Sequence, residues 1–194
     1  MASDVAICNT ALNRLGANTI TSFTENSKEA RLCNAEYQGI KDQLLRAHPW
    51  NCAISRAELA QDSIAPSFGF TYQYTLPTDP YCLRVLQMET EVINFKVEGR
   101  KLLTNESTAK IMYISRVQDS EEFDALFVDT LSARIAFEFS FNITGSRTLQ
   151  TDLFSLYSEK LALARSFDAQ ESGIFYNQGN GDRIIADEFI NRRK

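Results

Sequence analysis

Hydrophobic residues recur with helical spacing towards both ends of this chain, whereas the middle of the sequence has the texture of short strands. From Val5 to Leu15, apolar side chains follow one another at steps of three and four, the period of an amphipathic helix. Between residues 50 and 117, prolines and short β-rich runs replace these stripes. We therefore predict an α+β fold in which a bundle of about four helices carries a β-rich insert at about 50–117.

Local signals place the helix ends. Ser3 and Ser146 are positioned to cap the first and fourth helices, and Asp119 has capping-box spacing to Glu122 at the start of the third. Pro49 ends the second helix near Ala47, because proline disfavours a helical residue before it. The predicted helices span about 3–16, 27–47, 120–142 and 146–171. The short break at 143–146 makes the last two antiparallel neighbours.

Six strands are predicted within the insert. Glu98, Gly99 and Arg100 form a tight hairpin turn between two of them, since Gly99 readily takes the positive φ of such turns. The predicted strands are 51–60, 70–76, 83–88, 92–97, 101–104 and 110–116.

Composition limits the class of protein. The 194 residues predict one compact unit, and 44% apolar residues supply a core without metals or disulfides. A net charge of −5 argues against a protein that coats nucleic acid. The four cysteines form no C-x-x-C pair, which indicates reduced thiols in a cytosolic product. No apolar run is long enough to span a membrane, so we expect no membrane insertion. The N-terminus has no basic region followed by an apolar stretch, so we expect no signal peptide.

Candidate catalytic groups are few. His48 is the one histidine, so it is a possible general base, but it is also explained as a helix-end residue. Four carboxylates near the third helix could include the pair that glycoside hydrolysis needs, although capping and the helix dipole also explain them. These carboxylates are Glu121, Glu122, Asp124 and Asp129. No phosphate-binding glycine motif is visible, and we expect no cofactor, no metal and no catalytic residue.

The third helix has apolar residues on more than one side. Phe137, Phe139 and Phe141 are candidates for a subunit interface, because a helix so widely apolar is buried in its own core or against another subunit.

Residues 173–194 are predicted to be a flexible C-terminal docking arm after a folded domain at 1–172. Glycine and asparagine recur from Gly173 to Gly181, and an apolar and basic stretch follows. This stretch either docks on another surface or folds back on its own bundle. Its candidate docking residues are Arg183, Ile184, Ile185, Phe189, Ile190, Arg192, Arg193 and Lys194.

Five segments of the chain, in order, resemble a known family. They are Asp4 to Gly16 (DVAICNTALNRLG), Leu44 to Asn51 (LLRAHPWN), Tyr74 to Pro77 (YTLP), Glu98 to Arg100 (EGR) and Ile143 to Ser146 (ITGS). Together they resemble tail tubular protein A, the head-to-tail adaptor of short-tailed bacteriophages. The resemblance covers essentially the whole chain.

The resemblance implies a structural virion protein rather than an enzyme. Adaptors of this family form a ring of twelve subunits between the portal protein and the tail nozzle, and they line the channel through which DNA leaves. It implies as partners the portal, a nozzle of tail tubular protein B type, further copies of the chain and passing double-stranded DNA, and no membrane. It also implies synthesis in the host cytoplasm, a final location at the head-to-tail junction, and portal binding by the C-terminal region. The alternative hypothesis is a virion-associated glycan hydrolase that uses the helix carboxylates.

Overall fold

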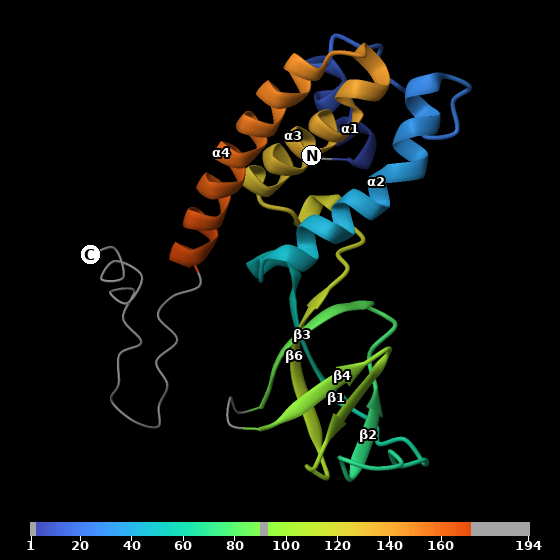
Figure 1. Ribbon diagram of the computed structural model, residues 1–194, viewed down its shortest axis with the longest axis vertical. Coiled ribbons are helices and arrows are strands. Elements are labelled where there is room, and N and C mark those ends of the chain that lie inside the picture. Colours follow the sequence, from blue (N-terminus) through green and yellow to red (C-terminus); the bar gives the residue numbers. More distant parts are fainter. Residues whose placement is uncertain (1–2, 90–92, 172–194) are drawn as a thin grey trace.

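The computed structural model describes residues 3–89 and 93–171. Over these residues it is an elongated molecule with helices at one end and strands at the other (Figure 1). Four α-helices and two three-stranded antiparallel sheets make up the α+β fold, which confirms the predicted class.

The helices are α1 (Asp4–Arg14), α2 (Lys28–Ala47), α3 (Ala125–Thr144) and α4 (Arg147–Glu171). Ser3 Oγ accepts a hydrogen bond from the backbone N–H of Ala6, and Ser27 Oγ accepts one from Ala30, so both serines cap their helices. Ser146 Oγ accepts from Leu149 at the start of α4, as expected. α2 ends at Ala47, before the extended residue His48.

The predicted start of the third helix at 120 is wrong. Ser120–Glu122 form a separate short 3-10 helix, η2, whose cap is Asp119. α3 begins five residues later than predicted, at Ala125, because the Asp124 carboxylate accepts the hydrogen bond of the Leu126 N–H. Two capping carboxylates lie in succession here, and the second one starts the long helix.

α3 lies at the centre of the helical part and contacts α1, α2 and α4. Leu131 and Ala133 are both fully buried although they point to nearly opposite sides of the helix, which confirms that α3 is covered on more than one side. Trp50 packs edge-on against Phe127, with ring centroids 5.1 Å apart. These contacts form the larger of two hydrophobic cores.

The β-rich part lies between α2 and α3 in the chain. One sheet has the order β1 (Ile54–Leu59), β6 (Ala109–Ser115), β3 (Cys82–Met88), and the other has the order β2 (Tyr72–Thr75), β5 (Lys101–Thr104), β4 (Phe95–Glu98). All pairs are antiparallel. The β4–β5 hairpin turns at Gly99, whose φ is 59°, as predicted.

The second core lies between the two sheets. Tyr74 and Leu102 from one sheet pack with Met88, Ile111 and Tyr113 from the other. In β6, Tyr113 belongs to this core whereas the next residue, Ile114, belongs to the helical core. β6 therefore joins the two parts of the molecule.

Polar contacts fix the junction between the two parts. Arg116, just after β6, forms an ion pair with Asp42 of α2 at 2.5 Å. Arg46 of α2 donates to the backbone carbonyl of Leu83 on β3.

All four cysteines are free thiols. None of the helices in the described ranges is long and apolar enough to span a membrane.

Candidate functional site

A pocket of about 350 Å³ lies where the base of the helical part meets the start of the insert. It is formed by the 3-10 helix η1 (Asn51–Ala53), by η2 and the start of α3, and by the last turns of α4. Its apolar lining includes Trp50, the one tryptophan of the chain, together with Phe127 and Phe167. The complete lining is Trp50, Asn51, Cys52, Glu122, Phe123, Asp124, Leu126, Phe127, Ala164, Phe167, Asp168 and Glu171.

Asp168 of α4 ties together the backbone on one side of this pocket. Its carboxylate lies 3.1 Å from His48 Nε2 and accepts a hydrogen bond of 2.9 Å from the Asn51 N–H. The Asn51 side chain donates in turn to the Asp168 carbonyl at 2.7 Å. His48 also meets Trp50 edge-on, with ring centroids 4.6 Å apart. These hydrogen bonds connect α4 to the segment that links α2 to β1.

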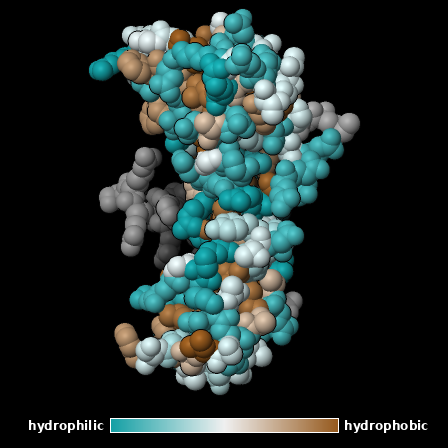
Figure 2. Space-filling view, turned by 90° about the vertical axis from the view of Figure 1, so that its right-hand side faces the viewer, coloured by the Kyte–Doolittle hydropathy of each residue, from teal (hydrophilic) through white to brown (hydrophobic). Residues whose placement is uncertain are grey.

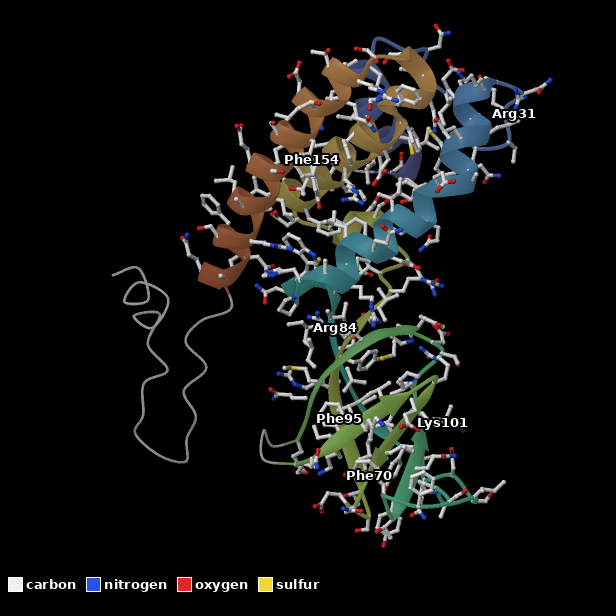
Figure 3. All side chains as sticks on the ribbon, in the orientation of Figure 1. Arg31, Phe70, Arg84, Phe95, Lys101 and Phe154 are labelled. Carbon is white, nitrogen blue, oxygen red and sulfur yellow. The ribbon has the colours of Figure 1, made fainter. Side chains whose placement is uncertain are left out.

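His48 and Cys52 lie in the same segment, but the pKa of Cys52 does not favour a nucleophilic role for its thiol. Burial lowers the pKa of His48, and the hydrogen bond and charge of Asp168 oppose that shift only in part, while Arg165 and Arg84 add to it. Figure 3 shows Arg84 near the junction of the two parts. Burial raises the pKa of the Cys52 thiol to about 11. A nucleophilic cysteine needs the opposite shift, because the thiolate is the reactive form.

Two of the four carboxylates suggested for glycan hydrolysis, Asp124 and Asp129, have structural roles. Asp129 pairs with both Arg14 and Lys160. Burial alone would raise the pKa of Asp129, but the hydrogen bonds from Lys160 and Arg14 outweigh it, so the pKa is lowered. Asp124 caps α3. Glu121 and Glu122 lie in η2, outside the long helix in which we had expected them. In the described part of the chain, no group of three or more His, Cys, Asp and Glu side chains is placed to hold a metal ion.

The rim of the pocket is acidic. Glu122 and Glu171 are exposed, and Asp124 and Asp168 add two further carboxylates. No lysine or arginine is among the described residues that line it. The pocket therefore combines the half-exposed ring of Phe167 with a negative rim, a combination suited to a ligand that carries both apolar and cationic groups.

The three candidate interface phenylalanines differ in position. Phe139 is 1% exposed and lies in the core of the chain itself, so it presents no surface to a neighbouring subunit. Phe137 is partly buried and packs against Phe154 of α4, with ring centroids 5.3 Å apart. Phe141 is 46% exposed. A surface role is thus open to Phe141 and in part to Phe137.

Further hydrophobic side chains are exposed on α4. Phe154, Leu163 and Phe167 are each 49–50% exposed, although they are large and apolar. Figure 3 shows Phe154 where α4 lies beside α3, and Figure 2 shows hydrophobic groups among hydrophilic ones on one face of the molecule. None of these α4 residues was among the predicted site residues. Their positions beside the apolar stripe of a helix were the signal that could have indicated them.

A second hollow of about 380 Å³ lies over the β1–β6–β3 sheet. Arg56, Glu58 and Met112 line it, and Lys110 and Glu89 pair at 3.1 Å on its side. This hollow is lined by both cations and anions, and two of them pair with each other. Its charges therefore do not indicate the class of ligand that it would bind.

The predicted docking residues from Arg183 to Lys194, and the whole of the expected arm at 173–194, lie outside the described residues. No model of a known protein family matches the chain, and no curated protein is significantly similar to it.

Proposed function

We propose that this chain is a structural head-to-tail adaptor that assembles as a ring between a portal protein and a tail nozzle. The family resemblance stated above motivates the proposal, and the surface of α4 supports it. The expected roles in genome retention and ejection, the dodecameric stoichiometry and the location in the virion belong to the same proposal.

The supporting observation is that α4 has exposed hydrophobic side chains on both sides of its buried stripe. Leu153, Tyr157 and Ala164 form that stripe against the rest of the bundle. Phe154 and Leu163 are nine positions apart, which is two and a half helical turns, so they lie on opposite sides of the helix. Subunits of a ring contact one another through two different surfaces, and α4 offers one on each side.

The five segments of the resemblance also occupy defined positions. The first is α1 with its terminating Gly16, whose φ is 67°. The segment from Leu44 to Asn51 forms the end of α2 and one wall of the pocket, and the segment from Ile143 to Ser146 forms the α3–α4 turn. These positions are structural ones, as expected for motifs that carry no chemical signature.

We do not propose the glycan hydrolase, because two of the carboxylates that motivated it have structural roles: Asp124 caps α3, and Asp129 pairs with two cations. The adaptor proposal is tested on purified virions of the source phage. Mass spectrometry of the virion proteins should detect the chain, and immunogold labelling should locate it at the head-to-tail junction. Its absence from purified virions would overturn the proposal.

A further inference from the structure

We infer that the pocket at the base of α4 binds the chain's own C-terminal segment, residues 183–194. The sequence allowed this segment either to dock elsewhere or to fold back. The chemistry of the pocket favours the second possibility for the isolated chain. The inference does not rest on the adaptor proposal, since the pocket and the segment belong to one chain.

The pocket and the segment are complementary in charge. Glu122, Asp124, Asp168 and Glu171 line the pocket. Three consecutive cations, Arg192 to Lys194, occur in the segment, separated by three residues from its two carboxylates, Asp187 and Glu188. The Asp168 carboxylate already accepts from His48 and Asn51, and one oxygen of Asp124 accepts from Leu126. Glu122, Glu171 and the other oxygen of Asp124 are therefore the expected partners of the cations. Opposite charges at such a rim set the orientation of a bound segment more than its affinity.

Apolar groups supply the complementary anchor. Phe189 and Ile190 precede the basic residues, with Asn191 between them, and the pocket offers Phe167 and the partly buried Leu126 beside its acidic rim. Phe167 is 49% exposed. Covering its ring with apolar side chains removes hydrophobic surface from water, which favours binding.

The chain connection favours the same molecule over a second copy. Glu171, the last described residue of α4, is itself part of the pocket lining, so the following residues start at the pocket. Eleven residues, 172–182, separate Glu171 from the segment, and a flexible chain of that length has a root-mean-square length of about 17–20 Å. A tether this short gives an effective concentration in the millimolar range. Intramolecular binding therefore prevails in dilute solution.

Zero-length cross-linking of the full chain tests the inference. A carbodiimide joins a lysine amine to a carboxylate in direct contact, and Lys194 is the lysine of this segment. We expect peptide mapping of the monomer to find Lys194 linked mainly to Glu122, Asp124 or Glu171. Links spread over carboxylates elsewhere on the molecule would overturn the inference.

A matched pair of variants separates a specific pocket from general proximity. Phe167→Ser removes an exposed part of the pocket wall, and Leu163→Ser removes an equally exposed side chain of the same helix outside the pocket. Loss of the Phe167 contact should lower the yield of these cross-links roughly fivefold. Leu163→Ser should leave the yield unchanged. Equal yields in the two variants would contradict the inference.

Mixed isotopic labelling distinguishes the two possible sources of the segment. When ¹⁴N and ¹⁵N chains are mixed at low concentration, intramolecular binding gives cross-linked peptides with one label only. Mixed-label peptides would show that a second copy donates the segment and would overturn the inference. Because this experiment uses the isolated chain, its failure leaves the virion test of the adaptor proposal unaffected.

Discussion

At the scale of single residues, Asp62 illustrates how the insert is fixed by charge. Its carboxylate accepts hydrogen bonds from Lys101 Nζ at 2.6 Å, Thr75 Oγ1 at 2.8 Å and Gln73 Nε2 at 3.0 Å. These contacts, with that of Lys101 the strongest, lower the pKa of Asp62 to about 2. They join the loop after β1 to both β2 and β5.

The lowered pKa of Asp62 predicts a contribution to acid stability. A carboxyl group with a folded-state pKa below its unfolded value of about 3.9 stabilises the fold above that pH. The stabilisation is lost as the pH falls from about 4 to about 2. Across this window the free energy of unfolding of the wild type should fall more steeply than that of Asp62→Asn. Urea unfolding followed by circular dichroism at several pH values measures both slopes, and equal slopes would contradict the assignment.

Two phenylalanines of α3 that are two residues apart should respond differently to truncation. Phe139→Ala leaves a cavity in the helical core and should cost about 3–5 kcal/mol of stability. Phe141 is 46% exposed. Phe141→Ala should therefore cost about 1 kcal/mol or less. Denaturant unfolding of the two variants provides the comparison, and similar losses would refute the placement of one of the rings.

At the scale of elements, the α3–α4 turn depends on one glycine. Gly145 ends α3 in the left-handed conformation, with φ 68°, and its N–H donates to the Phe141 carbonyl. Gly39 lies within α2 without positive φ, and a Cβ there would meet no atom within 4 Å. Gly145→Ala should destabilise the chain by about 1–2 kcal/mol, whereas Gly39→Ala should stabilise it by about 0.5–1 kcal/mol. Thermal unfolding of the two variants measures both changes in stability. A Gly145→Ala variant as stable as the wild type would contradict the role of Gly145 in the turn.

Element type was predictable from the sequence because helical and strand periods differ so clearly here. Within the described residues each predicted helix and strand is present, and the boundaries agree within a few residues except at the start of α3. The start of α3 was missed because Asp119 and Asp124 are both good caps, and sequence does not say which one starts the long helix.

The candidate pocket was not predictable in the same way. The sequence indicates His48 as a candidate, but its partner Asp168 lies 120 positions away on another helix. Nothing in the pattern of that helix indicates a contact with His48. The expectation for Phe139 failed for a related reason. Helical periodicity shows that α3 is apolar on several sides, but it does not distinguish burial within the chain from burial between chains.

At the scale of the whole molecule, the two sides of α4 should matter for assembly more than for folding. Phe154→Ser and Leu163→Ser should each leave a folded monomer and each weaken ring formation, because a ring uses both surfaces of every subunit. Ala162→Ser, on the exposed side of the same helix, is the matched control. Circular dichroism checks folding, and light scattering of the assembled complex checks the ring. A ring that tolerates both serine variants would show that α4 is not at the interface.

The central claim is that the chain is an adaptor that docks on a portal. Native mass spectrometry of the purified chain, alone and mixed with the portal ring of the same phage, tests it most directly. The account predicts a portal-bound complex with one copy of the chain for each portal subunit, and loss of that complex when residues 184–194 are deleted. A chain that ignores the portal and stays monomeric would contradict the account.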